Sequence, residues 1–523
     1  MRRSTFTSVR RFLLGIAITA TPAFANVDGT LDTRLDPPTT SHNTGAPGVF
    51  RFSWDLGGAL PNTNVDTSSA IGVQPDGKFL VAGYSWNTFA GQDQYACALA
   101  RYGAEGLLDP SFGSGGMIVN NFFNAQTGVD CYPLFVTLLG DGHIVWGGSL
   151  YTNVEFAWLG RMDANGTIDV TFGGSGNGFY IGGANTATAS LVVDTDGSLY
   201  AAGHAIPANF SDSDFYLLAL DPDGVFQYAR SVFFDLGGDR NDQAKALVLQ
   251  QIPGTSCGAN CFILPHSELY LVGTAANTPY QDLANHDCAV AAFRKDLFAT
   301  EFTIDTFFGP ALDGRLAIDF PVGSSNEGDN DCRVAISRPG NDYQQVGQGV
   351  VIGGENYFIS TLGGGTPGLA SNYALAEIDP AGNVAREDAF AFFEEFSTPG
   401  IYNGILAMVR EPGGRIVVTG YAGSSDPDRA PSDVGVIRFN PDYTRDTTFG
   451  NDGAGLAIVT LDGTLPTLQR EWGTALAIDT QGRLLLAGNR SFNYGSSADY
   501  DWLVARLNTS DIIFRDGIDG VVY

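Results

Sequence analysis

Few residues of this chain have types and spacings that suggest catalysis. The segment Gly254-Thr255-Ser256-Cys257-Gly258 matches G-x-S-x-G, the pattern around the nucleophilic serine of esterases. That serine works on a bend between a strand and a helix, whereas this match lies in a lengthened hairpin loop with no helical pattern after it. We therefore assign no catalytic residue, and we favour a protein that is not an enzyme while leaving the question open.

Residues that could bind a metal ion are also sparse in recognisable patterns. None of the five histidines forms a pair with metal-ligand spacing. The turns Asp194-Thr195-Asp196-Gly197 and Asp221-Pro222-Asp223-Gly224 resemble fragments of calcium loops, but neither supplies a closing bidentate carboxylate. An Asp side chain that caps its own turn explains both. We predict no cofactor and no metal ligand, and we leave open a structural calcium ion bound by other Asp residues between neighbouring repeat units.

Aromatic side chains offer a different chemistry. Rings next to Asn, Ser and Asp recur in segments that we expect to be loops between the second and third strands of a repeat unit. Rings provide contact area and amides provide directed hydrogen bonds, a combination that suits recognition of a sugar or a protein. The competing interpretation is that the rings cover strand ends. The candidate binding residues are Tyr84, Trp86, Asn87, His204, Tyr280, Tyr357, Tyr421 and Tyr494.

A sequence repeat must position these residues. An apolar strand that ends in glycine recurs seven times at intervals of 56 to 80 residues, ending at Gly83, Gly147, Gly203, Gly273, Gly353, Gly420 and Gly488. A turn such as Asp76-Gly77 precedes it, and a third strand and a segment such as Leu108-Asp109-Pro110-Ser111-Phe112-Gly113 follow it. Four antiparallel strands per unit are typical of a β-propeller blade.

We therefore predict an all-β fold, a seven-bladed β-propeller of four-stranded antiparallel blades. The last unit lacks an ordinary fourth strand, and an N-terminal stretch at about 49–58 matches the end of the third unit, so we expect this stretch to close the ring. An open solenoid would instead require capping units at both ends. The expected domain is 26–512, with repeats at about 65–124, 125–185, 186–242, 243–328, 329–400, 401–465 and 466–512.

Residues 74–116 contain a recognisable succession of motifs. They read Gln-Pro-Asp-Gly-Lys-Phe-Leu-Val-Ala-Gly, then Ala-Leu-Ala-Arg-Tyr, then Leu-Asp-Pro-Ser-Phe-Gly-Ser-Gly-Gly. This succession resembles the bacterial delta-60 repeat. The resemblance is specific in the first unit, good in the second, sixth and seventh, and degraded in the third to fifth. It implies an exported, propeller-like protein and carries no general activity or catalytic motif.

The first 25 residues have the features of an export signal. Four arginines precede an apolar stretch from Phe12 to Ala20, and Ala23-Phe24-Ala25 fits a cleavage site. We expect a protein that is secreted, on the cell surface or in the periplasm, without a membrane span. Removal of the signal leaves 24 basic residues against 57 acidic ones, a net charge near −33, which disfavours binding to nucleic acid and anionic lipid.

The six cysteines occur in phases of the repeat that suggest disulfides. Cys97 and Cys288 both lie near the start of a third strand, and Cys131 and Cys332 both lie in the first strand of the next unit. This phase predicts Cys97–Cys131 and Cys288–Cys332 as links between neighbouring units, and elimination leaves Cys257–Cys261. Free thiols or a metal site, with His286 beside Cys288, are the alternative.

Together these features favour an exported, non-catalytic binding or scaffold propeller, monomeric, which recognises a protein or glycan ligand through its loop face. The alternative is an extracellular polysaccharide hydrolase or lyase that uses carboxylates at the axial channel. The C-terminal tail, residues 513–523, is either a sorting signal or the end of the last blade.

Overall fold

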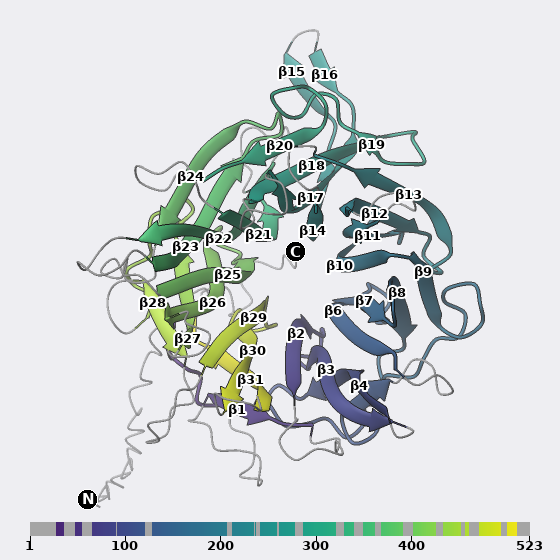
Figure 1. The fold of residues 1–523 in the computed structure, drawn as a ribbon, viewed down its shortest axis with the longest axis vertical. Helices are drawn as coiled ribbons and strands as arrows, with labels where there is room; N and C mark the ends of the chain where they lie inside the picture. The colour runs from purple at the N-terminus through teal and green to yellow at the C-terminus, as the bar shows by residue number, and fades with distance from the viewer. Residues whose placement is uncertain are drawn as a thin grey trace, which may run out of the picture.

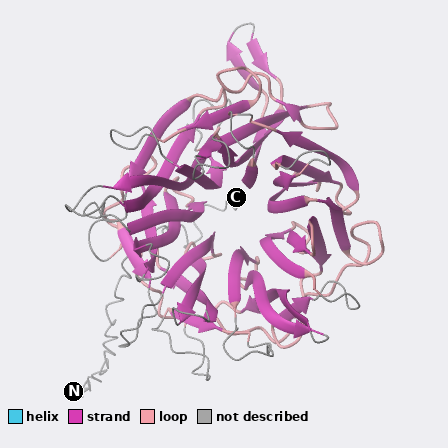
Figure 2. Cartoon of the chain, viewed as in Figure 1, coloured by secondary structure: helices cyan, strands magenta, loops and turns pink. Residues whose placement is uncertain are grey.

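The computed structural model describes residues 28–35, 48–54, 65–89, 92–120, 128–206, 212–234, 236, 241–258, 261–277, 286–320, 329–338, 349–360, 368–390, 401–424, 432–450, 455–459, 470–492 and 499–509. Every regular element in these ranges is a β-strand (Figure 2). No helix able to cross a membrane occurs in the ranges above. The predicted signal peptide, the C-terminal tail, Tyr280 and Tyr494 lie outside the described residues.

The strands form antiparallel sheets that follow one another along the chain and are arranged around a common axis (Figure 1). The first sheet contains β2 (Asp66–Val73), β3 (Phe79–Phe89), β4 (Gln92–Tyr102) and β5 (Met117–Asn120). The second contains β6 (Asp130–Leu138), β7 (Ile144–Tyr151), β8 (Glu155–Met162) and β9 (Phe179–Ala184). The third contains β10 (Thr186–Val193), β11 (Leu199–Ala205), β12 (Asp214–Leu220) and β13 (Phe226–Val232).

The later sheets vary this plan. The next contains β14 (Gln243–Ile252), β17 (His266–Ala276) and β18 (His286–Asp296), with both β19 (Thr303–Ile304) and β20 (Arg315–Ile318) paired to β18. The hairpin β15 (Thr255–Gly258) and β16 (Cys261–Ile263) projects from it (Figure 1). The following sheet contains β21 (Asp329–Ser337), β22 (Val350–Ser360), β23 (Gly368–Ile378) and β24 (Val384–Phe390).

The last sheet has eight strands, made of two four-stranded units. One unit is β25 (Ile401–Arg410), β26 (Ile416–Ser424), β27 (Ser432–Phe439) and β28 (Leu456–Val459). The other is β29 (Arg470–Ile478), β30 (Leu484–Phe492), β31 (Asp499–Leu507) and β1 (Val49–Phe52). A single parallel pair, Ser432 and Arg470, joins the two units.

The hydrophobic cores lie between neighbouring sheets rather than inside one sheet. One cluster combines Leu217 of β12 with Leu247 of β14 and Leu271 of β17, all buried. Short turns connect the first and second strands of several sheets, as between β2 and β3, and Gly77 in that turn, with φ of 85°, occupies a backbone conformation that other residues rarely adopt. Because both faces of most sheets pack on a neighbour, the second and third strands read as nearly continuous apolar runs.

The same three-residue motif recurs at the end of the third strand in several sheets: an arginine forms an ion pair with an aspartate and packs against the ring of a phenylalanine. Arg438 of β27 is fully buried, lies 2.8 Å from Asp446 and has its guanidinium 4.7 Å from the ring centroid of Phe449. Arg101 and Arg161 make equivalent contacts in the first and second sheets. Arg161 also donates to the carbonyl of Pro222 in the next sheet, at 2.6 Å. The repeated motif therefore joins neighbouring sheets.

The N-terminal segment 28–35 contacts the last sheet through its backbone and through two aspartates that pair with buried arginines. The backbone N–H of Gly29 donates to the carbonyl of Asn508 just after β31, and β1 pairs antiparallel with β31. Asp32, with a side chain 1% exposed, lies 2.9 Å from Arg506 Nε and 2.8 Å from Arg483 Nη1. Asp28 accepts a hydrogen bond from Arg438 at 2.7 Å. The segment thus binds residues more than 400 positions away.

Two disulfides are confirmed. Cys97 pairs with Cys131 and Cys288 with Cys332, with Cα–Cα distances of 5.1 and 5.2 Å. Each joins a third strand to the first strand of the next sheet. Disulfides persist in oxidising compartments, so they indicate an oxidising, extracellular environment. The side chains of Cys257 and Cys261 lie outside the described part of the structure, so this third pairing stays a prediction.

The Asp32 cluster predicts acid sensitivity. Burial alone would raise the pKa of Asp32, but hydrogen bonds from Arg34 and the charge of Arg506 lower it to about 2. The folded-state pKa is below the ordinary value of 3.8, so this contribution to stability is present above pH 4 and is lost as the pH falls towards 2. Urea unfolding between pH 5 and pH 2 should show that decline, and it should be shallower in Asp32→Asn. Parallel declines in both proteins would contradict the assignment.

Candidate functional site

The side chains that could bind a ligand lie mainly at one end of the sheets. We call it the loop end, defined as the end of each sheet where its second strand leads to its third, as between Phe89 and Gln92. Antiparallel pairing places the start of the first strand there too, because Asp66 at the start of β2 lies opposite Ser85 near the end of β3. The loop end therefore collects residues from three strands of each sheet.

Four aromatic rings form the densest group at the loop end, and we call Tyr84, Trp86, Tyr95 and Tyr132 the four-ring cluster. Trp86 of β3 lies directly opposite Tyr95 of β4, with ring centroids 4.7 Å apart at 75°. Tyr84 contacts Tyr95 at 5.3 Å, and Tyr132 of the next sheet at 5.0 Å. Edge-to-face contacts of this kind stabilise aromatic pairs, so the cluster forms a preorganised surface across two sheets.

The polar atoms of the four-ring cluster are hydrogen-bond donors. Burial is the main cause that raises the pKa of the hydroxyls of Tyr84, Tyr95 and Tyr132 above their ordinary value, so these groups stay neutral at physiological pH. The indole Nε1 of Trp86 is buried and has no hydrogen-bond acceptor within the described ranges. All four rings are half-buried. Flat apolar faces with donors at their edges suit a ligand rich in hydroxyl groups.

A disulfide fixes the spacing of this cluster. Cys97 lies opposite Tyr84 in the pairing of β3 with β4, and Cys131 immediately precedes Tyr132. The bond therefore holds the two strands that contribute rings from neighbouring sheets. A second aromatic pair, Trp472 and Tyr500, lies at the loop end of the last sheet with centroids 5.8 Å apart.

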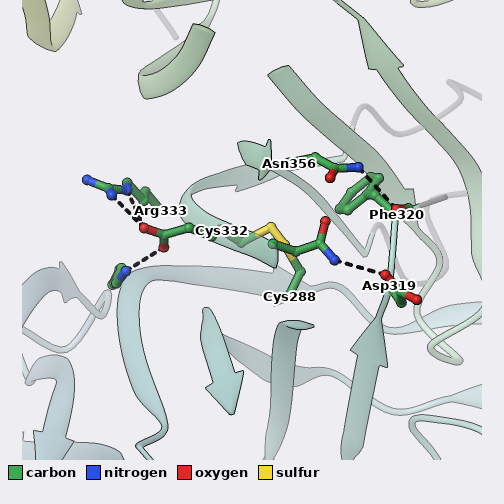
Figure 3. Close-up of a disulfide and its surroundings, with 9 residues drawn as sticks. Cys288, Asp319, Phe320, Cys332, Arg333 and Asn356 are labelled. Carbon is green, nitrogen blue, oxygen red and sulfur yellow. Dashed lines mark hydrogen bonds and ion pairs between the residues drawn. A yellow bond between two sulfur atoms is a disulfide. The ribbon is translucent and has the colours of Figure 1, made fainter. Parts of the chain in front are cut away.

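A charged group occupies the loop end on another side of the axis. The carboxylate of Asp331 in β21 accepts hydrogen bonds from Lys245 of β14 and from Arg333, whose Nε lies 2.7 Å away (Figure 3). Burial would lower the pKa of Arg333, but the charge of Asp331 and other groups raises it, so the guanidinium stays charged. The ion pairs bridge two first strands from neighbouring sheets.

Glu355 of β22 is the most buried carboxylate beside this group. Its side chain is 1% exposed and accepts a 2.7 Å hydrogen bond from Ser371. Burial raises the pKa of Glu355, although Tyr421, Ser371 and Tyr357 stabilise its charged form. Burial also raises the pKa of both tyrosines. The arrangement holds a carboxyl group that can carry a proton at a higher pH than usual.

His204 has a defined partner. Its Nε2 lies 3.1 Å from Glu155 Oε2, which belongs to β8 of the preceding sheet. Burial would raise the pKa of Glu155, but the hydrogen bond and charge of His204 lower it. This pair is a contact between two sheets at the loop end.

The structure groups the predicted binding residues in part. It brings Tyr84 together with Trp86, and Tyr357 together with Tyr421, whereas Asn87, opposite Gln94, lies on the other face of the strand pair from Trp86. The prediction that Tyr84, Trp86, Asn87 and Tyr357 lie in loops is wrong, because they belong to β3 and β22. The strands run further than expected since β3 and β4 stay paired to Phe89 and Gln92.

Sequence reasoning missed several residues of these groups. Tyr95 and Tyr132 flank the two cysteines of one disulfide at distances of two residues and one residue, a signal that the repeat phase could have revealed. Lys245, Asp331, Arg333 and Glu355 carry no local signal, because their contacts depend on which strands face each other.

Two comparisons with known proteins gave matches. The family "Domain of unknown function (DUF5122) beta-propeller" matches residues 74–112 and 412–449, which contain the Arg101–Asp109 and Arg438–Asp446 pairs. These matches support a β-propeller repeat. No curated protein matches the chain.

Solved structures resemble the chain only weakly. The arabinofuranosidase arb93a of Fusarium graminearum shares 10% identity, with coverage of 87% of this chain and 98% of that one, and a TM-score of 0.36. The β-propeller domain of the Trilobed protease of Pyrococcus furiosus shares 6%, with coverage of 85% and 94% and a TM-score of 0.33. The GH43 endo-arabinanase of Bacillus licheniformis shares 10%, with coverage of 62% and 100% and a TM-score of 0.26. These values are too low to transfer a function.

Proposed function

We propose that this chain is an exported, non-catalytic binding protein that recognises a glycan through the loop end of its sheets. The four-ring cluster carries this proposal. Its half-buried rings can stack on the apolar faces of sugars, and its neutral hydroxyls can bond to sugar hydroxyl groups. The alternative ligand for the same surface is a protein. Binding to a panel of oligosaccharides distinguishes a glycan ligand from a protein ligand.

The proposal includes a seven-bladed ring. It is supported by the succession of four-stranded units and by the pairing of β1 with β31, which would make β1 the outer strand of the seventh blade. Closure of the ring in this way would leave no inner strand without a neighbouring sheet. Export before residue 26 is supported by the sequence pattern of the first 25 residues and by the two disulfides.

Replacement of Trp86 by alanine should weaken glycan binding at least tenfold, about 1.4 kcal/mol, because it removes a stacking surface. The measurement is a glycan array followed by calorimetry with the best oligosaccharide. Phe298→Ala is the matched control, since this ring is 90% exposed and follows the end of β18 that lies away from the loop end. An unchanged affinity in Trp86→Ala, or silence across the array, would overturn the glycan proposal.

A second candidate is a polysaccharide hydrolase or lyase. The raised pKa of the buried Glu355, beside Tyr357, Tyr421 and the charged group of Asp331, favours it, because carboxyl groups that act as general acids have a raised pKa. Release of reducing ends or unsaturated products from polysaccharides, abolished in Glu355→Gln, would establish this candidate. If an oligosaccharide binds and no product is released, the proposal of a non-catalytic binding protein stands.

A further inference from the structure

A largely apolar cavity of about 350 Å³ lies between the segment 28–35 and the outer strand β28. One wall consists of Gly29, Thr30 and Leu31, and the other consists of the four residues of β28. Three of those four side chains are buried, whereas Ile458 is 38% exposed, so the cavity reaches the protein surface. It therefore lies at the junction between the last four-stranded unit and the unit before it.

The cavity results from a small side chain in β28. In the equivalent place between the first two sheets, Ile118 packs against Gly166, since a Cβ atom added to that glycine would lie 2.6 Å from Ile118 Cδ1. Ala457 takes the position of Ile118, because each lies opposite the residue two places before the arginine of the repeated motif. Gly29 takes the position of Gly166 in the turn. Alanine lacks the methyl groups that would reach this turn, and an unfilled apolar cavity lowers stability in proportion to its volume, so an apolar occupant is favoured.

The chain leaves the described residues beside this cavity. The backbone N–H of Asn508 donates to the carbonyl of Thr30 at 2.9 Å, and the side-chain amide of Asn508 donates to Thr30 Oγ1 at 3.2 Å. In the second sheet the equivalent backbone bond, from Asp163 to Thr167, closes a turn of continuous chain. Here two segments far apart in the sequence form the turn, and the residues after Thr509 must leave it next to the cavity wall.

The segment 510–523, which follows Thr509, contains side chains that fit the cavity. Ile512, Ile513 and Phe514 are its first large apolar residues. Five extended residues span up to about 17 Å, so all three can reach the cavity from Thr509. An apolar cavity of about 150 Å³ holds benzene, so the larger space here has room for a phenylalanine ring and part of an isoleucine.

We propose that Ile512–Phe514 dock in this cavity, and that the segment 510–523 is thereby held against the body of the protein. Burial removes three adjacent apolar side chains from water, which favours the docked state. The segments 36–47 and 451–454, which adjoin the two walls in sequence, contain no Val, Leu, Ile or Phe. The segment 460–469 contains three leucines, but it leads from β28 to Arg470, which pairs with Ser432 at the loop end.

Trypsin digestion of the intact chain tests the docking. Cleavage after Arg515 releases residues 516–523, which mass spectrometry follows, and docking of the adjacent Phe514 should keep this cleavage slow because the segment must first detach. Ala457→Ile fills the cavity, so it should accelerate the release at least tenfold. The control is Val384→Ile, since Val384 is 36% exposed in the outer strand of another sheet, and this variant should leave the rate within about twofold.

A double-mutant cycle gives a second readout. Phe514→Ser should lower the melting temperature of the otherwise wild-type chain and leave that of Ala457→Ile unchanged, because the filled cavity no longer accepts the ring. Two results would overturn the proposal: equal rates of cleavage after Arg515 in the wild type and Ala457→Ile, or equal effects of Phe514→Ser in both backgrounds. Either result would assign the cavity to another occupant, the segment 460–469 or water. Neither measurement involves a glycan, so the docking is tested separately from the proposed function.

Discussion

Asp32→Ala should lower the free energy of unfolding by about 3–5 kcal/mol. Asp32 is 1% exposed and lies within 3 Å of three guanidinium groups, of which those of Arg483 and Arg506 are almost fully buried. Without the carboxylate, Arg506 loses its acidic partner while it remains out of water. The cost of that uncompensated charge exceeds the worth of the ion pair itself.

Equilibrium unfolding in urea measures this change. The control is Asp141→Ala, since Asp141 is 62% exposed and its partner His143 is accessible, so less than about 1 kcal/mol should be lost. A double variant, Asp32→Ala with Arg506→Leu, should recover part of the loss by removing the buried charge. A single-variant effect no larger than that of Asp141→Ala would show that segment 28–35 does not hold the last sheet.

Removal of either inter-sheet disulfide should cost about 3–4 kcal/mol, because the bonds close loops of 34 and 44 residues. The two bonds should differ in their effect on binding. Only Cys97–Cys131 lies between the strands that carry the four-ring cluster. The double variant Cys97→Ala/Cys131→Ala should therefore weaken glycan binding at least tenfold, and Cys288→Ala/Cys332→Ala should leave it within about twofold.

These two double variants control for each other, since both bonds occupy the same position between neighbouring sheets. Binding is measured at a temperature at which both variants are folded by circular dichroism. Equal losses of affinity would mean that binding depends on general stability, and no loss in either would separate the four-ring cluster from the ligand.

Much of the architecture can be predicted from the sequence because the repeat carries it in local patterns. Turns such as Asp76-Gly77 mark several sheets, and the phase of Cys97 and Cys131 identifies their bond. The recurring glycines, such as Gly83, also mark the sheets, but the prediction that they end a strand is wrong, because the second strand continues past each of them. Strand ends were less predictable. The segments around Trp86 and Tyr95 have the composition of a loop, but the two rings pack across the strand pair and keep β3 and β4 together.

The role of segment 28–35 was missed for a different reason. Asp28-Gly29-Thr30-Leu31-Asp32 matches Asn165-Gly166-Thr167-Ile168-Asp169, which precedes the outer strand of the second sheet. Leu35 stands where that unit has Phe172, so the most visible mark of the motif is absent. The charged group around Asp331 is still harder to predict from the sequence, because Lys245 lies 86 residues away and contacts Asp331 only through the packing of neighbouring sheets.

The contact between Gly29 and Asn508 has a consequence for biosynthesis. In a chain made from its N-terminus, Asp32 emerges 474 residues before Arg506, so segment 28–35 is produced early and finds its binding site late. Until then β1 lacks β31, and a solitary strand of this kind invites pairing with other chains. Contacts of such long sequence separation also slow folding. A chaperone would therefore have its main task in the interval between the emergence of β1 and that of β31.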